Sequence, residues 1–103
     1  MLRTMDEAYK ILQLQNQNLN PLTSFYMMTR GNAEALSLSS EIGTLEPGSM
    51  ADICVMNSRA TPGMALRMDA ASSLSEELFV LQTMADDRSI AEVYVAGNPS
   101  KPH

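Results

Sequence analysis

The sequence predicts an α+β fold whose sheet is incomplete within the chain. Apolar residues recur at helical spacing in the N-terminal third, and only two runs have the composition of a strand. The elements follow one another as helices, strand, helix and strand. Two strands with apolar faces are marginal alone and leave unpaired edges. We therefore expect further strands, from outside these 103 residues, to complete the sheet.

The first predicted element is a helix over residues 4–16. Thr4 and Glu7 fit a capping box, in which the hydroxyl accepts from the Glu7 amide and the carboxylate reaches back. An apolar face follows at helical spacing, formed by Met5, Ala8, Tyr9 and Leu12. The polar residues 15–18 are predicted to form a loop.

A second helix is predicted to begin at Asn20 and Pro21, which suit the cap and the first turn. Gly31 is expected to end this helix, and Asn32 to cap a short helical piece over residues 33–36. The expected core face of the second helix consists of Leu22, Phe25, Tyr26 and Met28.

The dipeptide Pro47–Gly48 predicts a type II turn that leads into a strand over residues 52–57. Both faces of this strand are apolar, so both are expected to need cover. Residues 58–71, which include Thr61–Pro62–Gly63, are predicted to be an irregular connection.

A capping box at Ser73 and Glu76 predicts a helix over residues 73–85, lined by Leu74, Leu78, Leu81 and Ala85. After a polar break at 86–88, residues 90–96 are predicted to form a strand. The turn signal at 97–99 is expected to end the sheet, with no strand returning.

Composition excludes several classes of function. The net charge is −5 and the basic residues are scattered, so no basic stripe is available for nucleic acid. The apolar runs are shorter than the roughly 20 residues of a membrane span. Residues 1–10 contain no apolar signal core. The single cysteine, Cys54, agrees with a reducing compartment, and we expect a cytoplasmic location.

The stretch from Gly43 to Ser49 approaches the phosphate-loop pattern G-x-x-x-x-G-K-[ST] without meeting it. Ser49 stands where the pattern requires lysine. A phosphate loop also runs from strand to helix, whereas a strand follows here, so no helix N-terminus is available to bind an anion. This stretch is therefore interpreted as a structural turn.

Catalytic and metal-binding residues are also not predicted. Zinc needs three or four ligands, and the chain offers one histidine, His103, and Cys54, which we expect to be a small core residue. Asp86 and Asp87 are adjacent acids, for which a capping or solvated role is favoured over catalysis. The aromatic residues Tyr9, Phe25 and Tyr26 are expected to be core rather than a stacking surface. We predict no catalytic, substrate-binding or metal-binding residue.

Residues 43–56, GTLEPGSMADICVM, resemble the C-terminal signature of the amidohydrolase superfamily, I-G-x-L-x-P-G-x-x-A-D followed by a strand. A helix that carries Thr29, Asn32, Ala35 and Leu36 precedes the signature, as it does in that superfamily. Residues 1–10 and 86–97 resemble more closely the branch of the superfamily that deaminates guanine. The resemblance extends over essentially the whole chain.

The resemblance implies a parent enzyme with a (β/α)₈ barrel beside a composite β-sandwich domain. In that branch a bound zinc activates the water that converts guanine to xanthine and ammonia. The metal ligands of that branch, an H-x-H pair, two further histidines and one aspartate, have no counterpart in this chain. The chain alone is therefore expected to contain no zinc and to be inactive, as a C-terminal fragment would be.

The resemblance also implies a division of the chain. Residues 1–38 would be barrel-flanking helices, and residues 39–103 the C-terminal part of the β-sandwich domain with one helix at about 73–85. The missing N-terminal barrel would be the principal partner of this chain. Guanine would be a substrate of the parent only.

Two alternatives remain open at this point. The parent could be a different amidohydrolase, such as another aminohydrolase of purines or triazines. The chain could instead be a stand-alone interaction module that associates with itself through exposed strand edges and an apolar face. We expect a homo-oligomer in either case, because strands without their sheet partners tend to pair with each other.

Overall fold

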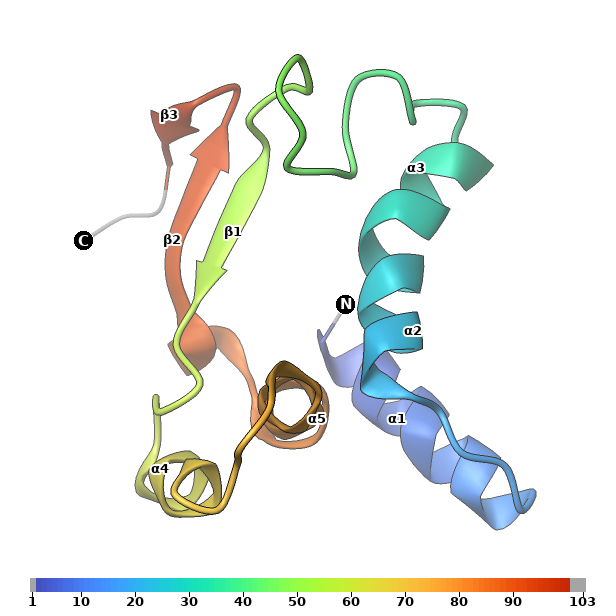
Figure 1. The fold of residues 1–103 in the computed structure, drawn as a ribbon, viewed down its shortest axis with the longest axis vertical. Coiled ribbons are helices and arrows are strands. Elements are labelled where there is room, and N and C mark those ends of the chain that lie inside the picture. Colours follow the sequence, from blue (N-terminus) through green and yellow to red (C-terminus); the bar gives the residue numbers. More distant parts are fainter. Residues whose placement is uncertain (1, 101–103) are drawn as a thin grey trace.

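The computed structural model describes residues 2–100. Two limbs rise from a common base of helices (Figure 1), and residues 36–52 cross between the limbs at the end opposite the base. The radius of gyration is 14.5 Å, whereas a compact domain of this length has about 13 Å. The tail residue His103 lies outside the described residues.

The first helix, α1, spans Leu2–Leu14 and confirms the predicted helix. It begins two residues earlier than predicted, so Thr4 lies inside the helix and the capping box with Glu7 is wrong. Met5 is buried on its inner face. Tyr9 of α1 packs edge-on against Phe79, with ring centroids 5.3 Å apart, and this aromatic contact fixes α1 to the base.

One limb is a continuous helical run made of α2 (Pro21–Tyr26), the π-helical η1 (Met27–Gly31) and α3 (Asn32–Ala35). The predicted cap is confirmed, because Oδ1 of Asn20 accepts from the Leu22 amide at 2.8 Å. The prediction that Gly31 ends the helix is wrong, since Gly31 is right-handed helical with φ −62° and ψ −43°.

Asn32 is helical as well and does not cap a new piece. Its side chain donates back to the Met28 carbonyl at 3.3 Å, within the same helical run. The ion pair between Arg30 and Glu34, at 3.0 Å, also spans the predicted break. The expected core face is only partly correct, because Leu22 and Tyr26 are exposed and Ser24 is buried instead.

The other limb is a three-stranded antiparallel sheet with the order β1-β2-β3. Strand β1 (Ile53–Met56) pairs with β2 (Ile90–Val95), so both predicted strands are confirmed. The prediction of no returning strand is wrong, since β3 (Asn98–Pro99) pairs with the end of β2. Ala96 and Gly97 both have positive φ, 50° and 83°, which suits a two-residue hairpin turn.

The helix α4 (Pro62–Met68) replaces the irregular connection predicted for residues 58–71. Thr61 caps it, since its Oγ1 accepts from the Met64 amide at 3.2 Å, and Pro62 occupies the first turn. Thr61–Pro62 therefore begins a helix, although Pro62–Gly63 has the composition of a turn and led to the prediction of an irregular connection. Met64 and Met68 then fall on one apolar face at i, i+4 spacing.

The helix α5 (Leu74–Met84) confirms the second predicted capping residue. Oγ of Ser73 accepts from the Glu76 amide at 3.2 Å, while the Glu76 carboxylate accepts from the Ser72 amide instead of reaching Ser73. The predicted core face needs correction. Leu74 is exposed, and Val80 and Gln82 are among the residues that α5 buries.

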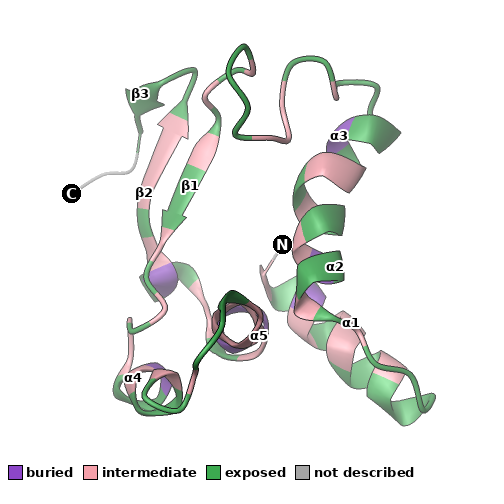
Figure 2. Cartoon of the chain, viewed as in Figure 1, coloured by how far each residue is buried: buried purple, intermediate pink, exposed green. Residues whose placement is uncertain are grey.

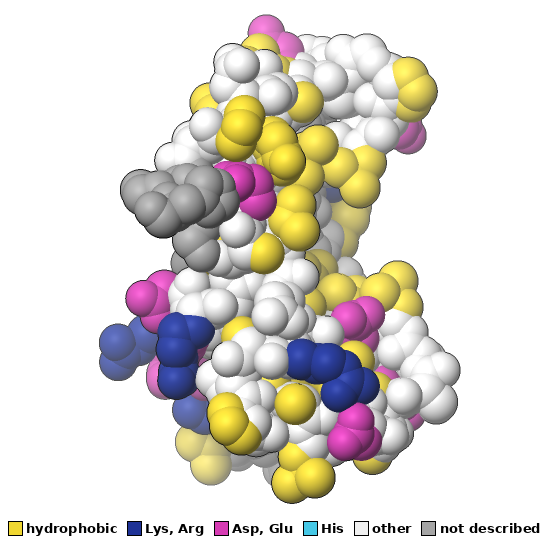
Figure 3. All heavy atoms as spheres, turned by 90° about the vertical axis from the view of Figure 1, so that its left-hand side faces the viewer, with side chains coloured by type: hydrophobic (Ala, Val, Ile, Leu, Met, Phe, Trp, Pro, Cys, Tyr) yellow, Lys and Arg dark blue, Asp and Glu magenta, His cyan; other side chains and the backbone are white. Residues whose placement is uncertain are grey.

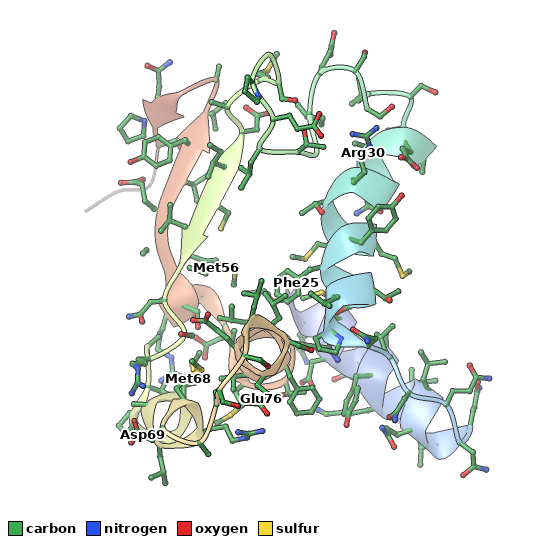
Figure 4. All side chains as sticks on the ribbon, in the orientation of Figure 1. Phe25, Arg30, Met56, Met68, Asp69 and Glu76 are labelled. Atoms are coloured by element: carbon green, nitrogen blue, oxygen red, sulfur yellow. The ribbon has the colours of Figure 1, made fainter. Side chains whose placement is uncertain are left out.

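The hydrophobic core lies at the base and centres on Met64, Val80 and Leu81. Phe25 from α2 and Met56 from β1 approach α5 from the two limbs, and Met68 lies on α4 (Figure 4). Buried residues therefore concentrate where the limbs meet, and the rest of each limb is mostly half-buried or exposed (Figure 2).

Beyond Met56, which packs on the core at the base, both faces of the sheet carry exposed side chains. Successive residues of a strand point to opposite faces, and the neighbours Cys54 and Val55 are both exposed. Extensive contacts between helices and the sheet are absent among the described elements. The helices and the antiparallel sheet confirm the α+β class. The apolar strand faces that were expected to need cover receive it from residues 2–100 only at the base, where Met56 packs on the core.

Candidate functional site

The phosphate-loop candidate is a closed structural loop. The Met50 amide donates to the Glu41 carbonyl at 2.6 Å, which brings the two ends of the loop together. Inside it, the hydroxyls of Thr44 and Ser49 lie 2.9 Å apart. The Ser49 amide donates to the Glu46 carbonyl at 3.1 Å, and Gly48 has φ +96°, which fits the predicted Pro–Gly turn.

The loop continues into β1 rather than into a helix, so it lacks the aligned amides of a helix N-terminus. Gly43 holds the loop against the helical limb. An added Cβ at Gly43 would lie 2.9 Å from Cβ of Ala33 and 3.2 Å from Cα of Arg30. The loop therefore packs backbone to helix, and its glycine serves this close approach.

Asp86 has the capping role that the sequence predicts. Asp86 caps the short 3₁₀ helix η2 (Asp87–Ser89), because its Oδ1 accepts from the Arg88 amide at 2.9 Å. Its carboxylate also pairs with the Arg88 guanidinium, with Nη2 and Oδ2 2.6 Å apart. Hydrogen bonding to Arg88 lowers the pKa of the Asp86 carboxyl. A carboxylate held in its ionised form is poorly suited to donate a proton at neutral pH.

A surface hollow adjoins these acids, between the start of α1 and the end of α5. It is lined by Leu2, Arg3, Asp6, Ala85, Asp86, Asp87 and Ile90. The charges in it are of both signs, and Asp86 is already satisfied by Arg88. No nucleophile paired with a base lies among these lining residues.

A buried polar pair was not predicted from the sequence. Oγ of Ser24 lies 2.5 Å from Oε1 of Gln82, and both residues are buried. The Ser24 hydroxyl is also 3.0 Å from the Pro21 carbonyl. The pair connects α2 to α5, and a serine and a glutamine at these positions give no periodic signal from which their burial could have been predicted.

The structure also places the cysteine and two of the aromatic residues considered in the sequence. Cys54 is exposed, so the prediction that it is a core residue is wrong. Phe25 packs on the core as predicted. Tyr26 is exposed, and its hydroxyl donates to Oε2 of Glu34 at 3.2 Å.

The described residues contain no cluster of three or more His, Cys, Asp or Glu side chains that could hold a metal ion. Within the same part of the chain, no helix is long and apolar enough to cross a membrane. The described residues leave large apolar side chains exposed on both limbs.

Comparison with known proteins places this fold in a family. The profile of the amidohydrolase family matches residues 1–99, and the chain belongs to that family. Among its relatives, the chain is similar to guanine deaminase from Escherichia coli (strain K12), with 48% identity over 97 residues. It is also similar to guanine deaminase from Mus musculus, with 36% identity over 97 residues.

The matches span most of this chain but a minor part of each relative. They cover 94% of this chain and 22% of the bacterial enzyme, and 89% of this chain and 21% of the mouse enzyme. A solved structure of E. coli guanine deaminase superimposes with a TM-score of 0.95 and 45% identity, over 99% of this chain and 24% of that one. The chain thus spans less than a quarter of the relatives it matches.

Proposed function

We propose that this chain is the C-terminal structural part of a guanine deaminase. The complete enzyme would add water to guanine and release ammonia, leaving xanthine. The observation that carries the proposal is the match to the E. coli enzyme, whose solved structure reproduces this fold over 99% of the chain. No other activity is named among the relatives described above.

Within that enzyme, we assign the chain a role in architecture. Residues 1–38 would flank the (β/α)₈ barrel, and residues 39–103 would contribute strands and one helix to a composite β-sandwich. The exposed side chains on both faces of the sheet support this role, because a sheet in a packed domain has apolar partners on at least one face. The helices α1 and α2 each pack on α5, which precedes strand β2, so the chain would join the barrel to the β-sandwich.

The chemistry itself would be carried out by residues outside this chain. Hydrolytic deamination needs an activated water and a group that protonates the departing nitrogen. Zinc would supply the activation when bound, but the described residues lack a set of donors that fits it. Asp86, at the surface hollow, is committed to Arg88. We therefore derive no catalytic step from residues 2–100.

A chimeric enzyme tests the proposal. In E. coli guanine deaminase, the segment that matches this chain is replaced by this chain, and release of ammonia from guanine is measured. We expect turnover within about tenfold of the parent, since we assign this chain no catalytic group and a core usually tolerates substitutions that conserve its volume and pattern. A folded chimera without guanine turnover would overturn the proposal.

The isolated chain provides the second arm of the test. Purified alone and supplied with zinc, it is expected to bind no stoichiometric zinc and to release no ammonia from guanine.

We also propose that the isolated chain forms a homo-oligomer. The observation that favours this second role is the number of large apolar side chains that remain exposed, including Leu14, Leu36 and Leu45. Light scattering after size exclusion measures the mass directly. A monomer at all concentrations would contradict self-association.

A further inference from the structure

The helical limb contains a turn that is wider than an α-helix. At the end of α2 the Met27 amide still donates to the Thr23 carbonyl, four residues back. In η1 the Asn32 amide donates to the Met27 carbonyl, five residues back. A π turn of this kind takes up one residue more than an α turn, and such turns are rare and frequent at functional sites. The helices on either side of η1 are therefore rotated relative to each other.

The buried residues of the limb reveal this rotation. Ser24 and Ala33 are nine residues apart, and each is only 2% exposed. A regular α-helix would place them on opposite sides, about 180° apart at about 100° per residue. One residue absorbed by η1 reduces this angle to about 80°. Ala33 is thereby turned toward the side on which Ser24 is buried.

A hydrogen bond that spans η1 agrees with the same rotation. The Tyr26 hydroxyl donates to Oε2 of Glu34 at 3.2 Å, across eight residues. A regular α-helix would hold the two residues about 80° apart, whereas one absorbed residue brings them to about 20°. Gly31 leaves room for the tyrosine, because an added Cβ would lie 3.3 Å from the Tyr26 carbonyl oxygen and 3.4 Å from its Cε1.

The rotation presents α3 to the crossing segment, residues 36–52. An added Cβ at Gly43 would lie 3.4 Å from the Thr29 carbonyl oxygen and 2.9 Å from Cβ of Ala33. Within the part of the chain that the structure describes, the core at the base includes no residue of α3. Figure 3 shows apolar side chains at the surface over the upper half of the molecule, where the sheet lies. The contact with Gly43, rather than the core, therefore orients α3.

Two side chains stabilise the wide turn. Oγ1 of Thr29 donates to the Phe25 carbonyl at 2.7 Å, and Nδ2 of Asn32 donates to the Met28 carbonyl at 3.3 Å. A hydroxyl bonded to the carbonyl four residues back bends a helix away from its regular geometry. Thr29 and Asn32 are two of the four helix residues on which the resemblance in the sequence rests, and these bonds give them a local role.

We infer that η1 is a register device, by which we mean a turn that absorbs one extra residue and so fixes the direction in which α3 faces. It brings Ala33 against Gly43, and Thr29 stabilises it. Because the crossing segment leads into β1, the turn also determines how the helical limb is joined to the sheet. None of these contacts depends on whether the complete enzyme deaminates guanine.

A deletion and an insertion at the same place test the register device. Either one of the adjacent residues Met27 and Met28 is deleted, or one alanine is inserted between them, in this chain and in the chimera described above. The deletion returns η1 to a regular turn and leaves α2 and α3 in phase. We therefore expect a thermal midpoint within about three degrees of the unaltered protein.

The insertion should behave differently from the deletion. It turns α3 by about a further 100°, and we expect the midpoint to fall by about ten degrees or more. Circular dichroism measures both midpoints. Equal midpoints for the two variants, whether high or low, would overturn the inference, and so would a deletion variant that does not fold.

Thr29→Val tests the residue that stabilises the turn. Valine keeps the shape of threonine but loses the bond to Phe25, so the midpoint should fall by about five degrees in the unaltered protein. In the deletion variant, which has no wide turn to stabilise, the same substitution should cost less than about two degrees. Thr23→Val, at an exposed position on α2, is the matched control and should cost as little in both proteins. Equal losses for Thr29→Val in both proteins would overturn its assigned role.

A paired substitution tests the contact between α3 and the crossing segment. Ala33→Gly removes the atom that an alanine at position 43 would meet at 2.9 Å, so it should restore part of the midpoint lost in Gly43→Ala. The restoration should persist in the deletion variant, where the two residues still meet. Its loss in the deletion variant would show that η1 is more than one absorbed residue and would overturn the inference.

Discussion

The Ser24 hydroxyl on α2 lies 2.5 Å from Oε1 of Gln82 on α5, and both residues are buried. The contact joins positions that are 58 residues apart in the sequence. Among the described residues, Nε2 of Gln82 has no hydrogen-bond partner. One end of a buried amide thus holds two helices together, while the other end carries the cost of lost hydration.

Removing either partner should have unequal effects. Ser24→Ala leaves both ends of the Gln82 amide unpaired, and we expect a loss of about 1–3 kcal/mol in the free energy of unfolding. Gln82→Leu removes the unpaired donor, while the Ser24 hydroxyl keeps the Pro21 carbonyl at 3.0 Å. Chemical denaturation should then show a change of less than about 1 kcal/mol. Equal losses in the two variants would contradict this account.

Two glycines with similar backbones allow a clash to be separated from strain. Gly43 and Gly48 have φ of +99° and +96°, but an added Cβ at Gly43 meets Ala33 at 2.9 Å, and at Gly48 it meets nothing within 4 Å. We expect Gly48→Ala to cost about 1 kcal/mol from backbone strain, and Gly43→Ala about 1–3 kcal/mol more. Parallel urea denaturation of both variants measures the difference, and equal costs would show that the loop is not tightly packed.

The core at the base should depend strongly on one methionine. Met64 is completely buried and belongs to the central cluster. Met64→Ala is expected to lower the free energy of unfolding by about 2–5 kcal/mol. Met50→Ala, at an exposed position, is the matched control and should cost less than about 0.5 kcal/mol. Thermal unfolding followed by circular dichroism checks both values.

The Asp86–Arg88 pair predicts that the stability of the fold decreases at acid pH. Hydrogen bonding to Arg88 lowers the pKa of Asp86 from 3.8. A carboxyl whose pKa is lower in the folded state stabilises the fold above the pKa of the unfolded state. This contribution is lost as the pH falls through the lowered value.

Arg88→Gln should therefore raise the pKa of Asp86 toward 3.8 and remove that part of the acid sensitivity. Carbon-13 NMR titration of the Asp86 carboxyl measures the shift. Lys10→Gln removes a cation that pairs with Asp6 on α1, and it should leave the titration of Asp86 unchanged. An unaltered pKa in Arg88→Gln would refute the assigned cause.

Local sequence signals predicted a helix start correctly where a capping side chain bonds to the backbone of the first turn. Asn20–Pro21 and Ser73 were correct as helix starts because a short polar side chain there accepts from an amide of the first turn. Thr61–Pro62 carries the same signal, but the following Gly63 favoured a turn. Gly31 failed as a stop signal, because glycine permits a helix end without requiring one.

The burial pattern was harder to predict because it depends on contacts between distant residues. Gln82 is buried together with its partner Ser24, whereas Leu74 is exposed although it belongs to the predicted apolar face of α5. Cys54 was expected in the core from its apolar strand, but a strand sequence does not say whether its cover lies in the same chain. That this chain carries no catalytic residue was predicted from the kinds of residue present, and it stays a prediction.

The segment of residues 36–52 that crosses between the two limbs sets the distance between them. The limbs meet through side chains at the base, and residues 36–52 join them by backbone at the other end (Figure 1). Gly43 fixes this crossing to Ala33, and the Gly97 amide fixes its far end by donating to the Ala51 carbonyl at 3.0 Å. The crossing therefore acts as a spacer anchored at both ends, and its length determines the width of the frame that the chain presents.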